Sequence, residues 1–140
     1  MRFDVILSIC GRQSYQDQDP EIIELVTEGT MEFRDGGWDI VYDESELTGL
    51  QGVTTIFRVE REKVILNRTG RLNSQMVFKE GVCHESLYQM EFGALMLSVC
   101  ATRVYADLCD EGGMIDIVYN IDIEQSAAGT IDYHVDIRRK

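Results

Sequence analysis

The amino-acid sequence predicts an all-β chain folded as a single antiparallel up-and-down β-barrel. Apolar and polar residues alternate along most of the chain, which places successive side chains on opposite faces of a strand. Turns that contain glycine separate these segments at intervals of about 8–12 residues, a spacing typical of a sandwich or a barrel. The first and last segments are both amphipathic. Pairing these two end strands would remove the exposed sheet edges, which favours the barrel.

The alternation is clearest at the two ends of the chain. Near the N-terminus, apolar side chains share one face at Phe3, Val5, Leu7 and Ile9. Near the C-terminus, apolar residues occupy every second position over residues 115–123 and again over residues 131–137. Each of these segments predicts a strand with one buried face and one face in water, as antiparallel sheets require.

Shorter segments of the same kind fill the middle of the chain. They cover residues 38–43, 53–60, 64–68, 76–78 and 88–92. Residues 21–26 could form one helical turn, but β-branched side chains and the following Gly29 favour a strand. Residues 94–105 are apolar on both faces, so the pattern leaves their register open.

Length and composition set further limits. The 140 residues, 44% of them hydrophobic, predict one globular domain spanning residues 1–140. The formal net charge of −12 repels phosphate groups and predicts no nucleic-acid partner. No apolar run approaches the ~18 residues of a membrane helix, and the first residues lack a signal-peptide pattern. We therefore expect a cytoplasmic protein without a membrane partner, whose cysteines are reduced thiols at Cys10, Cys83, Cys100 and Cys109.

A series of short motifs runs from residue 38 to residue 119. In order, they are Trp38-x-Ile40-x-Tyr42-x-Glu44, Thr55 with Ile56 and Val59, Arg68-x-Gly70, Met76-x-Phe78 with Gly81, Tyr88-x3-Phe92-Gly93, and Gly113-x-Ile115-x-Ile117-x-Tyr119. In this order and spacing, they resemble the YwiB-like family of uncharacterised bacterial proteins. The resemblance implies a calycin-like barrel, similar in architecture to lipocalins and fatty-acid-binding proteins. It implies no established activity.

A set of candidate ligand contacts follows from the predicted inner face. If the apolar sides of the strands face a barrel interior, Glu44 and Arg68 are charged groups at or near that interior, where each must pair or meet a ligand. With other polar and aromatic side chains they form a candidate ligand-binding set, namely Trp38, Tyr42, Glu44, Thr55, Arg68 and Tyr88. The competing interpretation places Glu44 in water at a strand end and extends Arg68 to the barrel rim. Because both residues lie beside turns, the pattern favours this second interpretation.

The large aromatic side chains on the same face also allow two interpretations. They form either a platform for a ligand or the packed filling of the barrel, at Trp38, Phe57, Phe78, Tyr88 and Phe92. So many large inward side chains favour packing.

No motif points to a metal, a cofactor or a reaction. Cys83 and His84 are adjacent, so in a strand they would point to opposite faces and could not easily share an ion. Close pairs of cysteine or histidine, typical of zinc sites, are missing from the sequence. The sequence also contains no G-x-S-x-G, P-loop or dinucleotide fingerprint. We expect no metal, no cofactor and no catalytic residue.

Three classes of function remain. The leading hypothesis is a binding barrel that holds a small, partly apolar molecule. The alternative is a non-catalytic interaction or structural module with a filled barrel, acting through its acidic exterior or as a homodimer. An enzyme ranks third. A binding barrel should contain a cavity of at least ~300 Å³ or copurify with a ligand.

Overall fold

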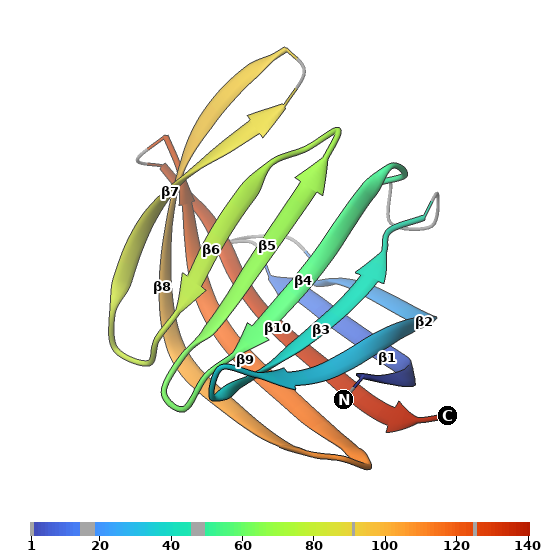
Figure 1. Ribbon diagram of the computed structural model, residues 1–140. Coiled ribbons are helices and arrows are strands. Elements are labelled where there is room, and N and C mark those ends of the chain that lie inside the picture. The colour runs from blue at the N-terminus through green and yellow to red at the C-terminus, as the bar shows by residue number, and fades with distance from the viewer. Residues whose placement is uncertain (1, 15–18, 46–49, 91, 125) are drawn as a thin grey trace.

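A computed structural model describes residues 2–14, 19–45, 50–90, 92–124 and 126–140. Over these residues the chain forms one antiparallel sheet of ten strands, shown in Figure 1. The strands are β1 (Arg2–Ser14), β2 (Glu21–Arg34), β3 (Gly37–Asp43), β4 (Val53–Val59), β5 (Val64–Gly70), β6 (Ser74–Phe78), β7 (Cys83–Met90), β8 (Gly93–Cys109), β9 (Gly112–Ile123) and β10 (Ser126–Arg139). Among the described residues, no helix is long and apolar enough to cross a membrane.

The sheet closes as the end pattern predicts. Its strand order is β6-β5-β4-β3-β2-β1-β10-β9-β8-β7, so every strand lies beside its neighbours in sequence and the two terminal strands pair with each other. The β1–β10 register runs from Val5 opposite Arg139 to Ser14 opposite Thr130. The prediction of an up-and-down antiparallel barrel, and of a strand over residues 21–26, is therefore confirmed.

The last gap in the barrel lies between β6 and β7, which are joined by the turn over residues 79–82. At the other end of β6, Asn73 and Gln89 form an isolated bridge with two backbone hydrogen bonds of 2.9 Å. The N–H of Gly81 also donates to the carbonyl of Ala101 at 2.9 Å. These contacts bring β6 against β7 and leave the barrel nearly closed.

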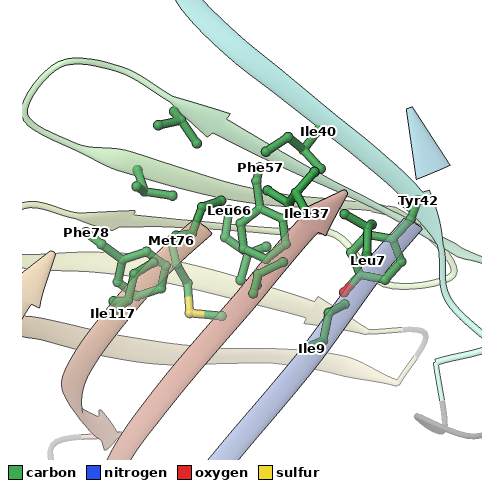
Figure 2. Close-up of a cluster of buried hydrophobic side chains, with 14 of the residues drawn as sticks. Leu7, Ile9, Ile40, Tyr42, Phe57, Leu66, Met76, Phe78, Ile117 and Ile137 are labelled. Atoms are coloured by element: carbon green, nitrogen blue, oxygen red, sulfur yellow. The ribbon is translucent and has the colours of Figure 1, made fainter. Parts of the chain in front are cut away.

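Alternation puts the apolar side of each strand into the barrel and builds one core. Phe57, Phe78 and Ile117 are almost completely buried there, beside Ile40 and Met31. Figure 2 shows this cluster, with Tyr42 beside Leu7 and Ile9 at one side of it. The core occupies the body of the barrel and supplies the main favourable term in folding, because burial of apolar surface is worth roughly 25 cal/mol per Å².

The register of β8, which the sequence leaves open, changes along the strand. Leu97, Val99 and Ala101 face inward, and a bulge between Ala101 and Arg103 then shifts the pairing with β9 by one residue. Beyond the bulge Val104 and the following even-numbered residues pack against the core. The extra residue at the bulge therefore changes the inward-facing positions from odd-numbered to even-numbered residues. This explains why the sequence of β8 is apolar on both faces.

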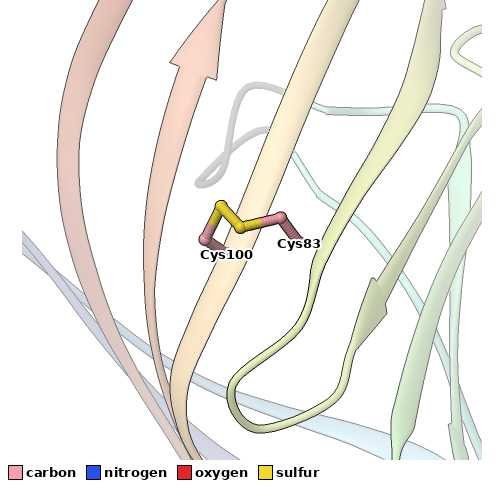
Figure 3. Close-up of a disulfide and its surroundings, with 2 residues drawn as sticks. All are labelled: Cys83 and Cys100. Carbon is pink, nitrogen blue, oxygen red and sulfur yellow. A yellow bond between two sulfur atoms is a disulfide. The ribbon is translucent and has the colours of Figure 1, made fainter.

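The expectation of four reduced thiols is wrong for two of them. Cys83 and Cys100 are joined by a disulfide, shown in Figure 3 between β7 and β8, while Cys10 and Cys109 are free. The two bonded cysteines are 17 residues apart in sequence but directly opposite in the antiparallel register, with Cα atoms 4.1 Å apart. Their neighbours His84 and Val99 face inward, so the bond lies on the outer face of the barrel.

We predict that the Cys83–Cys100 bond stabilises the fold. Closing a loop of this length lowers the conformational entropy of the unfolded chain, which stabilises the folded state by about 3 kcal/mol. The double substitution Cys83→Ser and Cys100→Ser should therefore lower the free energy of unfolding in urea by about this amount relative to the oxidised protein. Cys109→Ser, at an exposed free thiol, is the matched control. Equal stability of the oxidised protein and the double variant would contradict the prediction.

Candidate functional site

One end of the barrel is hollow. β2 pairs with β1 over residues 21–32 and with β3 over residues 30–34, so β1 and β2 continue past the end of β3. A cavity of about 190 Å³ lies at this end. Its described lining is Ile9, Gly11, Gln13, Glu21, Ile23, Leu25, Tyr42, Glu44, Leu50, Arg68, Tyr119, Ile131 and Tyr133. Ile23 is 53% exposed and Glu21 is also exposed, so these two mark the mouth, whereas Tyr42 and Tyr119 lie deep inside.

Direct cross-strand pairing gathers the polar side chains of the site. Tyr42 on β3 lies opposite Thr55 on β4, which lies opposite Arg68 on β5, which lies opposite Ser74 on β6. Residues directly opposite in an antiparallel sheet share one face. The four side chains therefore form an inward-facing row across four strands.

Gly29 fixes the position of Tyr42 in this row. A Cβ atom at residue 29 would collide with the carbonyl oxygen of Val41 and lie 3.2 Å from the Cβ of Tyr42. It would also lie 3.1 Å from Cδ1 of Leu7. Glycine is needed here because the two backbones approach too closely for any side chain between them.

Glu44 is a buried carboxylate with its own donors. Its side chain is 7% exposed, and the hydroxyl of Thr55, which is completely buried, donates to Glu44 Oε1 at 2.9 Å. Tyr42 also hydrogen-bonds to Glu44. The interpretation that placed Glu44 in water at a strand end is therefore wrong. The reason is that the alternation of β3 continues for one residue past Asp43, where the Glu44 N–H still donates to the carbonyl of Val53 at 2.8 Å.

Arg68 and Ser74 present the opposite situation. Arg68 Nε and Ser74 Oγ are both buried and have no hydrogen-bond partner among the described residues. The two side chains occupy directly opposite positions on β5 and β6. A buried donor without an acceptor costs about 1–3 kcal/mol, so Arg68, which lines the cavity, is incompletely satisfied, while Ser74 is not among the described lining residues.

Three tyrosines complete the interior. Tyr42 and Tyr133 hydrogen-bond to each other, and Arg68 acts electrostatically on both Tyr119 and Tyr133. Burial raises the pKa of all three phenols above the usual value; the nearby Glu44 raises that of Tyr42 further, while Arg68 opposes part of the rise at Tyr119. All three therefore stay protonated at neutral pH and can donate hydrogen bonds.

The same tyrosines connect the cavity to the core. The ring of Tyr133 lies 5.9 Å from that of Phe57, and the ring of Tyr119 lies 4.7 Å from that of Phe78. Each ring adds apolar packing while its hydroxyl faces the polar groups, which is the usual role of a buried tyrosine.

The structure gathers four of the six candidate residues from the sequence. Tyr42, Glu44 and Arg68 line the cavity, and Thr55 holds Glu44 from behind. Trp38 lies near the other end of β3, edge-on to Phe33 with ring centroids 5.1 Å apart, and Tyr88 packs against the core from β7. Neither is among the described residues that line the cavity.

Sequence reasoning missed Tyr119, Tyr133 and Ser74. The two tyrosines lie on the apolar faces of clearly alternating strands. A tyrosine buried there has a hydroxyl that needs a hydrogen-bond partner. That signal could have added them to the candidate set. Nothing in the sequence singles out Ser74, because only the register of β5 and β6 places it opposite Arg68.

The aromatic set divides between core and surface. Phe57 and Phe78 are fully buried core residues, as the packing interpretation predicts. Phe92 is 91% exposed, so its assignment to the inner face is wrong. Figure 1 shows the β7–β8 hairpin extending beyond the neighbouring strands, which carries the residues near its turn away from the interior.

The described residues hold no group of three or more His, Cys, Asp or Glu side chains placed to bind a metal ion. Cys83 and His84 point to opposite faces of β7, as their adjacency predicts. The described lining of the site therefore combines a buried carboxylate at Glu44, a second carboxylate at the mouth at Glu21, one guanidinium and three phenols with an apolar wall.

Comparison with known proteins places the chain in a family. A family model described as "Domain of unknown function (DUF1934)" matches residues 7–137. The chain belongs to the DUF1934 family. A relative by sequence is the protein named "Uncharacterized beta-barrel protein YwiB" from Bacillus subtilis (strain 168), which is 29% identical over 107 residues, covering 76% of this chain and 74% of YwiB.

The same architecture is found in a solved structure. The crystal structure of the YwiB protein from Bacillus subtilis superposes with a TM-score of 0.89 at 23% identity, covering 99% of this chain and 93% of that chain. The fold of this DUF1934 chain is therefore the YwiB barrel. The resemblance seen in the motifs between residues 38 and 119 is confirmed.

We predict that the bond from Thr55 to Glu44 contributes to the stability of the DUF1934 barrel. Thr55→Val keeps the shape of the side chain but removes a donor to a buried carboxylate, which should lower the free energy of unfolding by about 1.5–3 kcal/mol. Thr54→Val is the matched control, because Thr54 makes a 2.9 Å bond to Asp43 on the exposed face. Urea unfolding measures both, and equal losses would contradict the prediction.

The buried phenols of this DUF1934 protein also predict a loss of stability in alkali. Above pH of about 10 the unfolded chain releases phenolic protons that the folded chain retains, so stability falls as the pH rises. Each tyrosine with a raised pKa contributes up to about 1.4 kcal/mol per pH unit. Tyr42→Phe should therefore make the fall in unfolding free energy shallower. Tyr105→Phe, at a half-exposed side chain, is the control, and an unchanged slope in Tyr42→Phe would refute the prediction.

Proposed function

We propose that this DUF1934 chain is a non-enzymatic binding barrel that holds a small, partly apolar molecule in its hollow end. The observation that carries the proposal is the cavity itself, with apolar walls from Ile9, Leu25 and Ile131 around a few polar groups. A mostly apolar concave site with a small number of placed polar groups is the usual composition of a small-molecule site.

The cavity sets the size of this molecule. At about 190 Å³ it is smaller than the ~300 Å³ we expected and smaller than a drug-sized site. An apolar cavity of about 150 Å³ holds benzene, so by the same ratio this one holds about eight non-hydrogen atoms. The proposed ligand is therefore a short molecule, with room for a longer tail to leave through the mouth beside Ile23.

The alternative function, an interaction module with a filled barrel, has less support because the barrel is hollow at one end. A cytoplasmic location belongs to the proposal. The Cys83–Cys100 disulfide is a feature that weighs against this location, because disulfides are rare in the cytosol. Since both sulfurs lie on the outer face, ligand binding at the inner face would not require the bond.

The experiment compares the wild-type protein with Gly11→Val, both purified gently from the native host and weighed by native mass spectrometry. Gly11 lines the cavity, and a Cβ there would lie 3.6 Å from the ring of Tyr133, an ordinary contact. The variant should therefore fold and fill the cavity. Ser8→Val, an exposed position on the outer face of β1, is the matched control.

We expect the wild type and Ser8→Val to retain a small added mass that Gly11→Val lacks. The same spectra report whether the protein is a monomer or the homodimer of the alternative hypothesis. No added mass in any of the three proteins, or the same mass in all three, would count against the binding function.

A further inference from the structure

Arg68 is the one base among the described residues that line the cavity, and its bonding is incomplete. Its Nε is buried without an acceptor in the described structure. Ser74, 9% exposed and directly opposite Arg68 on the neighbouring strand, holds a second buried polar atom without a partner. Two neighbouring unsatisfied groups facing the same interior are rare in folded proteins, where almost all buried polar atoms are paired.

The carboxylate in the cavity is placed differently. Glu44 accepts hydrogen bonds from Thr55 at 2.9 Å and from Tyr42. The Glu44 side of the cavity is therefore supplied with donors by the protein, whereas the buried Nε of Arg68 has no acceptor among the described residues. A ligand that completes the site must bring an acceptor, and a negatively charged acceptor forms the stronger bond to a guanidinium.

We propose that the polar end of the ligand is a carboxylate, held by Arg68 with the phenol of Tyr119 nearby. This inference rests on the proposed binding function and names its ligand class. The guanidinium offers a planar fork that matches a carboxylate, and Ser74 lies opposite Arg68 in the strand register but outside the described lining of the cavity. Tyr119 adds a phenolic donor close enough to feel the charge of Arg68, whereas the single proton of Tyr133 goes to the Tyr42 oxygen because Tyr42 donates its own to Glu44.

The charge of the site favours a monoanion over a dianion such as a phosphate monoester. Glu44 and Glu21 also line the cavity, so a second negative charge on the ligand would meet two carboxylates and only one base in the described lining. The tail of the ligand then contacts the apolar wall formed by Ile9, Leu25 and Ile131. A straight-chain monocarboxylate of about eight non-hydrogen atoms fits both the polar end and the volume.

The test uses three probes of matched length, hexanoate, hexanol and hexylamine, titrated into the ligand-free protein and followed by protein-observed NMR. We expect hexanoate to bind about tenfold or more tightly than hexanol, because only the carboxylate gains charge-assisted bonds to Arg68. Hexylamine should bind more weakly than either, since Glu44 already has its donors.

The variant Arg68→Met separates the contact from the cavity. It should remove most of the preference for hexanoate, while the dissociation constant of hexanol changes by less than about threefold. Arg68→Lys, which keeps the charge but loses the planar fork, should retain part of the preference and serves if Arg68→Met fails to fold. Arg103→Met, at an exposed arginine paired with Asp116 on the outer face, is the matched control and should behave as the wild type.

Two results would overturn the inference, and they differ in what they leave. If hexanol or hexylamine binds as tightly as hexanoate, the carboxylate assignment fails and the binding function stands. If none of the three probes binds and native spectra show no retained mass, both the assignment and the proposed function fail.

Discussion

The pairing of β1 with β10 is the constraint on which the rest of the molecule depends. It joins the two ends of the chain through ten successive residue pairs, from Val5 opposite Arg139 to Ser14 opposite Thr130, and turns a sheet into a barrel with an inside. Without it, both strands would present open edges, a hazard for aggregation. The β6–β7 gap needs fewer bonds, because a short turn already joins these strands and the cost of closing a loop rises with its length.

Closure creates two different interiors. At the core end, apolar side chains such as Phe57 and Phe78 fill the space. At the hollow end, Glu44 remains buried because Thr55 and Tyr42 replace the water that it loses. The tyrosines belong to both regions, with rings in the core and hydroxyls in the cavity. The polar cluster therefore keeps the hollow end open. Purely apolar side chains in its place would have packed together and closed the cavity.

The sequence predicts most of the fold and part of the site. Strict alternation identifies the strands, and the amphipathic ends predict their pairing, because a period of two fixes which face is buried. It does not predict the Cys83–Cys100 bond, since only the β7–β8 register brings residues 17 apart in sequence into opposition. The sequence names Arg68 as a candidate but favours a place for it at the rim, because alternation does not predict how far along a strand a side chain meets the interior. Trp38 and Tyr42 share a face, yet they lie toward opposite ends of β3, and only Tyr42 reaches the cavity.

The net charge of −12 is a poor guide to the charge of what enters the barrel. Acidic side chains such as Asp116 and Glu28 lie on the outer face, where water and salt screen their field over about 8–10 Å. Inside the cavity, screening is weaker and a few groups decide the outcome. A cation drawn in by the outer field would meet a carboxylate whose donors are already provided by Thr55 and Tyr42. An anion would meet Arg68, whose buried Nε has no acceptor in the described parts of the chain. The sign of the preferred ligand is therefore set by local hydrogen bonding and opposes the sign suggested by composition.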